Sequence, residues 1–290
     1  MFEIENLDIY IYPRYLIKNL SLTLNKGDKL AIIGEEGNGK STLLKAILGI
    51  ANYASVTGKV HFHGNKVGYL EQSLDENTLM QTSKEFLFKN ENDYYEKIGT
   101  FYKYLEIFEL NEKILNQPLH TLSGGEKVKI RMLKLFLEEV DIYILDEPTN
   151  DLDIASLEWL EKFIKETDKP IIYVSHDETL LANTANKILH LEQLKKKMEP
   201  RHTLEKIDYD TYVKERLRKI THQTQIAKFE KKEFKKKSAK LEKIRQKVER
   251  EQNTISRSDP HGARLLKKKM HNVKAQEKKL ENSRYNDFNP

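Results

Sequence analysis

A glycine-rich segment near the N-terminus has the residue types and spacing of a phosphate-binding loop. The segment is Gly34-Glu35-Glu36-Gly37-Asn38-Gly39-Lys40-Ser41, which fits the pattern G-x-x-x-x-G-K-[ST]. Glycines at these positions let successive backbone N–H groups point inward around phosphates, and a following helix adds positive potential at its N-terminus. In this pattern the lysine, Lys40, reaches the β- and γ-phosphates, and the Ser41 hydroxyl ligates Mg²⁺. The segment therefore predicts a nucleoside-triphosphate site.

Two adjacent carboxylates about a hundred residues further on provide the second chemical signal. The apolar run Ile142–Leu145 ends at Asp146 and Glu147. The first acid suits Mg²⁺ coordination, directly or through water, and the second suits polarisation of an attacking water. A buried strand that merely ends in two acids is the structural alternative. The phosphate-binding loop upstream favours the catalytic interpretation.

Short apolar runs alternate with longer helical patterns through the first 195 residues, as is typical of α/β architecture. The run Leu30–Gly34 predicts a buried strand, and Lys40–Leu48 predicts the helix that follows it. Three more such runs are VGYLEQ, DIYILDEP and PIIYVSHD. Strands buried on both faces have this composition, and ligands bind beyond their carboxyl ends. The polar residues named above fall at those ends.

Further motifs resemble those of one family. The run Leu122-Ser123-Gly124-Gly125-Glu126 precedes DEPTNDLD at Asp146–Asp153, and Ser175-His176-Asp177 follows. In this order the motifs resemble an ATP-binding-cassette (ABC) nucleotide-binding domain from Met1 to about Leu194. The resemblance implies an α/β P-loop NTPase fold with a helical subdomain. We therefore predict a cassette at residues 1–197, followed by a basic helical linker at 198–290.

The same resemblance implies roles for individual residues. Gln72 would contact Mg²⁺ and the attacking water, and His176 would lie near the γ-phosphate. Ser123, Gly124, Gly125 and Glu126 would form the signature loop, which caps the γ-phosphate held by another cassette, and Asn150–Asp153 would lie at the interface of the two. The implied catalytic residues are Lys40, Gln72, Glu147 and His176; the implied Mg²⁺ ligands are Ser41, Gln72 and Asp146; the implied ATP contacts are Gly34, Glu35, Glu36, Gly37, Asn38, Gly39, Lys40, Ser41 and Thr42.

For two features of the expected ATP site, the adenine-stacking residue and the direction of the Glu36 side chain, no motif defines the answer. One of Tyr10, Tyr12 and Tyr15 stacks on adenine in our interpretation, and we prefer Tyr12. Glu36 is an unusual neighbour for a polyphosphate, so we expect its side chain to point away.

Two features resemble the ABC-F group within the family. Only 32 positions separate Lys40 from Gln72, and a long charged helical segment follows the cassette. Members of that group have two cassettes on one chain, no membrane domain, and a linker that enters the ribosome's exit site toward the peptidyl-transferase centre. The residue that usually follows DEPTN in the group is His, whereas this chain has Asp151, which leaves the subgroup open.

The charge distribution independently indicates a polyanionic partner. The net charge is +5, but residues 195–290 contain 29 Lys and Arg against 14 Asp and Glu, which leaves 21 against 31 in residues 1–194. An acidic body joined to a basic arm favours binding to a polyanion, with a merely solvated helical face as the alternative. Together with the resemblance, this predicts rRNA or tRNA on the ribosome as the partner.

The basic segment has a seven-residue repeat typical of paired helices. The first arm has apolar residues at Val213, Ile220, Ala227, Phe234, Leu241, Val248 and Ile255, and the second at Leu266, Val273 and Leu280. Pro260 and Gly262 lie between the arms, as is typical of a turn. We predict an antiparallel helical hairpin with its tip at about residues 254–264. Its first arm would be roughly 70 Å long at ~1.5 Å per residue.

Composition bounds the remaining possibilities. No segment approaches the ~18 apolar residues of a membrane helix, which predicts no membrane insertion, and the absence of Cys excludes disulfides and a cysteine nucleophile. We expect a cytoplasmic protein. Because one cassette cannot complete a composite ABC site, we expect either the first half of a longer chain or two copies paired head to tail. The alternatives are the ATPase subunit of a membrane transporter, a coiled-coil DNA-repair or chromosome ATPase, and a non-enzymatic nucleotide-sensing scaffold.

Overall fold

The structure is a computed structural model that describes residues 1–150, 152–194, 199–254 and 260–288. It contains two compact units, Met1–Val213 and Lys214–Pro290. The first unit extends past the predicted cassette boundary at residue 197. It does so because strand β9 (Glu199–Glu205) pairs with β8 (Lys187–Leu194) and so adds to the central sheet.

The central sheet of the first unit has six strands in the order β5-β6-β7-β3-β8-β9. Its other members are β3 (Lys29–Ile33), β5 (Val67–Leu70), β6 (Ile142–Asp146) and β7 (Ile171–Val174). The first five strands in this order are parallel, and β9 runs antiparallel to β8. Every residue of β6 and β7 is buried, which explains their nearly continuous Ile, Leu and Val composition. The predicted α/β fold is confirmed.

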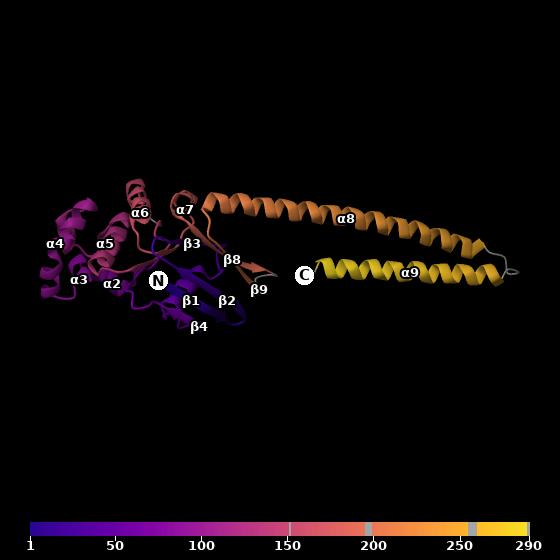
Figure 1. Cartoon of the computed structure of the whole chain (residues 1–290), viewed down its shortest axis with the longest axis horizontal. Helices are drawn as coiled ribbons and strands as arrows, with labels where there is room; N and C mark the ends of the chain where they lie inside the picture. Colours follow the sequence, from indigo (N-terminus) through magenta and orange to yellow (C-terminus); the bar gives the residue numbers. More distant parts are fainter. Residues whose placement is uncertain (151, 195–198, 255–259, 289–290) are drawn as a thin grey trace. The chain divides into compact units, whose positions relative to one another are not determined.

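Two hydrophobic cores occupy opposite faces of this sheet. One face packs against α1 (Lys40–Ile47) and a three-stranded antiparallel sheet of order β2-β1-β4. The strands of that sheet are β1 (Phe2–Ile11), β2 (Arg14–Leu24) and β4 (Ser55–His61). The other face packs against helices. These are α2 (Glu76–Met80), α3 (Ser83–Leu87), α4 (Glu91–Ile107), α5 (Gly124–Leu137), α6 (Ile154–Glu166) and α7 (Glu178–Thr184), with 3₁₀ turns at Glu112–Asn116 and Leu119–Thr121. Of these helices, α2, α3, α4 and α5 gather at one end of the unit (Figure 1).

The second unit consists of two long helices. Helix α8 (Tyr209–Thr254) begins within the first unit, and α9 (Pro260–Phe288) runs back in the opposite direction within the second (Figure 1). Residues 255–259 of the predicted tip lie outside the described residues. Helix α8 ends at Thr254 and α9 begins at Pro260, a position where proline's fixed φ favours a first helical turn. The tip at about residues 254–264 stays a prediction.

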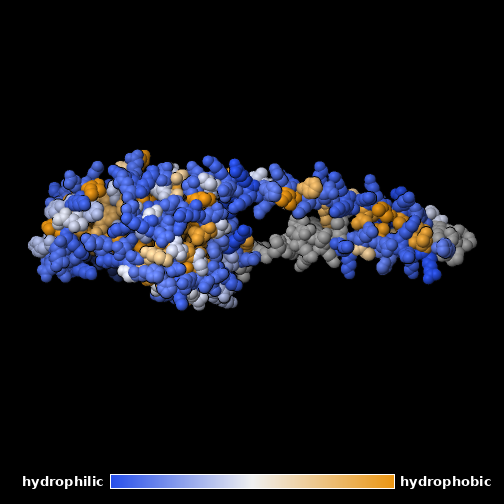
Figure 2. Space-filling view, viewed as in Figure 1, coloured by the Kyte–Doolittle hydropathy of each residue, from blue (hydrophilic) through white to orange (hydrophobic). Residues whose placement is uncertain are grey.

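The apolar residues of the seven-residue repeat, which form a predicted seam between the long helices, are buried to different extents. Val248, Leu266 and Val273 are buried, whereas Ile220 on the same predicted seam is 47% exposed. Figure 2 shows hydrophobic residues gathered between the helices toward their connection and hydrophilic residues over the outer faces. Within the described part of the chain, no helix is both long and apolar enough to cross a membrane.

Candidate functional site

The nucleotide-binding and catalytic residues predicted from the sequence meet at one edge of the central sheet. The phosphate-binding loop follows β3, and Gln72 follows β5. Asp146 is the last residue of β6, Glu147 comes directly after it, and His176 follows β7. Because the carboxyl ends of parallel strands meet at one edge, these side chains come together. A cavity of about 470 Å³ lies there and is lined by Glu36, Gly37, Gly39, Lys40, Ser41, Thr42, Gln72, Glu147, Asn150 and His176.

The phosphate-binding loop is anchored to β8. Gly34, Gly37 and Gly39 all have positive φ, a conformation that glycine adopts without a steric penalty. A Cβ at Gly34 would lie only 2.4 Å from the Leu191 carbonyl oxygen, and the buried Asn38 side chain donates to the same oxygen at 2.9 Å. Glycine at position 34 is therefore required by close packing as well as by backbone conformation.

Lys40 lies inside this loop. Its Nζ donates to the Gly34 carbonyl at 2.9 Å. Burial lowers the pKa of Lys40, and the negative charges of Glu147, Glu36 and Asp146 oppose that effect. Glu36 also lines the cavity. The direction of its side chain, which we expected to point away, stays a prediction. The loop thus presents a cation at the edge of the cavity, close to several carboxylates.

Ser41 and Asp146 form a pair suited to a hard divalent cation. The Ser41 hydroxyl donates to the Asp146 carboxylate at 2.9 Å, and the Tyr69 hydroxyl donates to its other oxygen at 3.4 Å. Burial raises the pKa of Asp146, while both hydrogen bonds lower it. Among the described residues no cluster of three or more His, Cys, Asp or Glu could hold a metal by itself. An oxygen-binding ion here would need phosphate oxygens and water as additional ligands, which is usual for Mg²⁺.

Glu147 and His176 form the second pair. Their Oε1 and Nε2 atoms are 3.2 Å apart, and Glu147 is 8% exposed. Burial raises the pKa of the Glu147 carboxyl, whereas His176 and Lys40 lower it. Glu147 has φ of 49°, a left-handed conformation that is rare for a residue with a side chain and common at functional sites. A carboxylate with a raised pKa, held beside a phosphate loop, is suited to accept a proton from water.

The four predicted signature residues do not join this cavity. Ser123 caps the N-terminus of α5 in a capping box, where its backbone N–H donates to the Glu126 carboxylate at 2.8 Å and Glu126 N–H donates to the Ser123 hydroxyl at 3.3 Å. Gly125 packs so closely on α6 that a Cβ would lie 2.8 Å from Ser156 Oγ. None of the four lines the cavity at the phosphate-binding loop. Their role toward another cassette therefore stays a prediction.

Strand β2, directly after its turn with β1, begins with a residue that reaches the phosphate-binding loop and that the sequence did not reveal. Arg14 donates to the Gly37 carbonyl at 3.0 Å, and no motif marks this arginine. Tyr12, in the same turn, is 86% exposed and does not line the cavity. Its stacking on adenine stays a prediction. Asp151, where the sequence departs from the ABC-F pattern, lies outside the described residues.

The strand that anchors the loop also holds the first turn of α8. His190 of β8 and Tyr212 of α8 are both buried, and His190 Nδ1 lies 2.5 Å from the Tyr212 hydroxyl. His190 directly precedes Leu191, the residue that contacts the phosphate-binding loop. No sequence motif marks this contact, because it depends on long-range packing.

Comparisons with known proteins agree with this geometry. Residues 17–150 match the family model described as ABC transporter. The chain is 36% identical over 203 residues to the ATP-binding protein Uup of Buchnera aphidicola, a match that covers 67% of this chain and 33% of the relative. It is 37% identical over 185 residues to the ribosome protection protein VmlR of Bacillus subtilis, covering 63% of this chain and 33% of the relative. The chain thus spans about a third of the length of these relatives.

Two more similarities extend the comparison. The human ATP-binding cassette sub-family F member 3 is 30% identical over 187 residues, covering 62% of this chain and 25% of that protein. A solved dimeric ATP-binding cassette, bound to ADP and Pi after hydrolysis, has a TM-score of 0.55 at 22% identity and covers 70% of this chain and 98% of its own. That structure supports the fold alone. On its motifs, its site and these relatives, the chain belongs to the ATP-binding cassette family and to its ABC-F group.

Proposed function

We propose that this chain binds ATP with Mg²⁺ and hydrolyses it to ADP and phosphate. One observation carries the proposal: a single cavity brings together the phosphate-binding loop and the Glu147–His176 pair. Lys40 would neutralise the β- and γ-phosphates, and the Ser41–Asp146 pair, with Gln72, would hold Mg²⁺. The bound ion would neutralise charge on the phosphate oxygens.

Catalysis at such a site depends mainly on positioning and on charge stabilisation around the γ-phosphate. Glu147, with a pKa raised by burial, would orient the attacking water and accept its proton. His176, 3.2 Å away, would hold the Glu147 carboxylate in place. Tyr12, in the turn next to the loop, would stack on the adenine ring.

The second cassette is part of this proposal. Because Ser123–Glu126 cap α5 and do not line the cavity at the phosphate-binding loop, they are available to another cassette's ATP. That cassette would come from the same polypeptide or from a second copy paired head to tail. The solved cassette that resembles this fold is described as a dimer.

The proposed site of action is the ribosome. Two relatives are named as an elongation factor and a ribosome protection protein, and residues 195–290 have a charge balance opposite to that of the cassette. Lysine-rich helices suit structured RNA, which proteins recognise largely through phosphates, sugars and shape. We propose that α8 and α9 reach toward rRNA and tRNA near the peptidyl-transferase centre, in translation or in protection from antibiotics. A cytoplasmic location follows from that partner.

The substitution Glu147→Gln tests both parts of the proposal. In a protein that joins this chain to a second cassette, it should slow ATP hydrolysis by roughly 10²–10⁴-fold, the usual contribution of a general base. It should also retain the protein on ribosomes when ATP is present, as measured by co-sedimentation. Glu106→Gln, an exposed acid on α4, is the matched control.

Each outcome has a separate meaning. Unchanged hydrolysis in Glu147→Gln would contradict the catalytic proposal. Lost hydrolysis with the same sedimentation in the presence and absence of ATP would contradict the ribosomal one. Co-purification with an integral membrane protein would favour the transporter alternative.

A further inference from the structure

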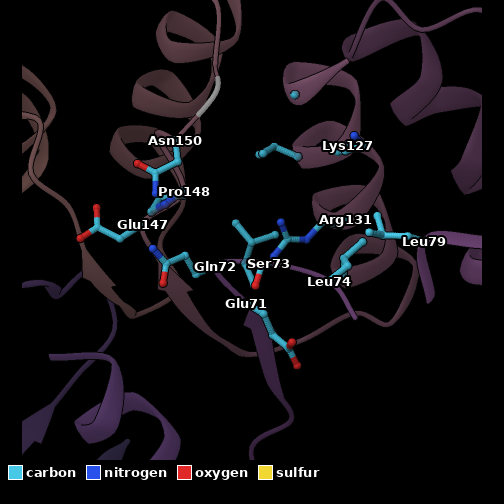
Figure 3. A pocket seen from close by; sticks show the side chains of 13 residues that line it. Glu71, Gln72, Ser73, Leu74, Leu79, Lys127, Arg131, Glu147, Pro148 and Asn150 are labelled. Atoms are coloured by element: carbon cyan, nitrogen blue, oxygen red, sulfur yellow. The ribbon is translucent and has the colours of Figure 1, made fainter. Parts of the chain in front are cut away.

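A second cavity adjoins the proposed ATP site and contains a buried, unpaired arginine. It has a volume of about 200 Å³ and lies between the segment after β5, helix α5 and the residues that follow β6 (Figure 3). Its lining includes Gln72, Glu147 and Asn150, which also line the cavity at the phosphate-binding loop. The two cavities are therefore neighbours with a shared wall, and that wall contains the residues next to the γ-phosphate in our proposal.

The arginine is Arg131 of α5. It is 9% exposed, and its Nη2 atom has no hydrogen-bond partner among the described residues. In Figure 3 its guanidinium points into the cavity toward the segment of Gln72 and Ser73. A buried charged donor without a partner is costly, so such a group usually bonds to water, an ion or a ligand.

The nearest acid does not supply that ligand. The negative charge of Glu71 raises the pKa of Arg131 against the lowering effect of burial, but the two side chains form no ion pair in the described structure. Glu71 also lines the cavity, and Figure 3 shows its carboxylate pointing away from Arg131. A second cation, Lys127, lines the cavity one helical turn before Arg131. The cavity thus contains two cations, Arg131 and Lys127, beside the acids Glu71 and Glu147. The planar N–H donors of Arg131 suit a small oxyanion.

We propose that this cavity binds inorganic phosphate and receives the phosphate released from ATP. This inference rests on the proposed hydrolysis. Phosphate formed beside Glu147 would pass the shared wall at Gln72 and Asn150 and bind Arg131, with Lys127 adding long-range attraction. Phosphate is a suitable occupant because it is the small oxyanion that the neighbouring reaction releases, and because guanidinium binds phosphate in a bidentate manner.

The direct test measures phosphate binding without hydrolysis. The chain is first saturated with Mg-ADP, so that the phosphate-binding loop is occupied, and is then titrated with inorganic phosphate in a calorimeter. Arg131→Gln should weaken phosphate binding by about tenfold or more, the usual effect of losing a charged hydrogen bond. Arg131→Lys keeps the charge but loses the planar fork, and should give an intermediate affinity.

The matched control is Lys113→Gln, which removes an exposed positive charge that lines neither cavity. It should bind phosphate within twofold of the unsubstituted chain. The melting temperature and the affinity for Mg-ADP of each variant establish that it is folded. If Arg131→Gln fails that check, the comparison of Arg131→Lys with Lys113→Gln decides the question. No phosphate binding by the unsubstituted chain, or equal binding by the Arg131 variants, would overturn the proposal.

A kinetic measurement separates this site from the hydrolysis itself. In a protein joined to a second cassette, rapid acid quenching measures phosphate formation, and a fluorescent phosphate sensor measures phosphate release. Arg131→Gln should leave formation within about threefold and lengthen the delay before release. Unchanged delay would count against the phosphate site while leaving the ATPase proposal intact. If hydrolysis is absent while phosphate still binds at Arg131, the ATPase proposal fails and the phosphate site stands.

Discussion

The cassette and the pair of long helices differ in how their side chains are buried and how their polar residues are distributed. In the cassette, strands buried on both faces end at one edge, where a few polar residues meet. In the long helices most described side chains are exposed, and beyond Tyr212 in the first turn of α8 apolar burial is concentrated at Val248, Leu266 and Val273. The cassette's proposed function therefore depends on individual side chains in fixed positions. That of the helices depends on the sum of many charges.

The largest effect should come from removing charge from the helices without touching the cassette. Replacing Lys235, Lys236, Lys237, Lys267, Lys268 and Lys269 by Gln removes six exposed charges. If each contacts a phosphate, the slope of log affinity for RNA against log salt should fall by up to about six. Filter binding over a salt series measures that slope, and ATP affinity should be unchanged.

The control for this variant removes the same charge from the cassette. Six exposed lysines are available there: Lys18, Lys26, Lys59, Lys89, Lys103 and Lys113. Equal losses of RNA affinity in both variants would remove the proposed distinction between the two units.

A single cation should matter in the cassette. Lys40→Ala removes the charge inside the phosphate-binding loop and should weaken ATP binding by about 10–100-fold, the effect of losing one charged hydrogen bond. Lys113→Ala should have no effect. Fluorescent ATP-analogue titration measures both. An Lys40→Ala chain with normal affinity would contradict the assignment of the loop.

Because the apolar side chains along the helices are buried to different extents, replacing them by Ala should destabilise the helices to different extents. Leu266→Ala should destabilise the paired region by about 2 kcal/mol, because it leaves a cavity. Ile220→Ala, at a site that is 47% exposed, should cost less than about 0.5 kcal/mol. Hydrogen exchange of α9 amides reports this local stability. Similar protection in the two variants would show that the seam is equally important along its length.

The smallest effect concerns pH. His176 lowers the pKa of Glu147, whose deprotonated form is the proposed base. Removing His176 should raise that pKa, so hydrolysis in His176→Ala should be lost at a higher pH as the solution is acidified. The pH profile of kcat/KM measures the position of this limb independently of the overall rate. His222→Ala, an exposed histidine of α8, should leave the limb in place, and an unmoved limb in His176→Ala would exclude the coupling.

Motifs predicted the cassette's fold and the meeting of Lys40, Ser41, Asp146, Glu147, and His176, because strand ends and a phosphate loop have strong local signatures. Contacts between distant segments were not predictable. Arg131 looks like an ordinary polar residue of an amphipathic helix, and only packing reveals that its guanidinium is buried beside Gln72. Strand β9 was missed because its sequence, EPRHTLE, has no apolar run. The seven-residue repeat predicted the helices correctly but treated all seam positions as equivalent.

Strand β8 has a consequence for how this protein tolerates mutation. The backbone at Gly34 lies close to the Leu191 carbonyl of this strand. His190, the residue before Leu191, contacts Tyr212 in the first turn of α8. A side chain added at position 34 would have to displace the same strand on which Tyr212 rests. Substitutions at positions 34 and 190 should therefore be non-additive, since both act on one shared element. Sequence drift in the ATP loop is thus constrained by the base of a helix that never touches ATP in our proposal.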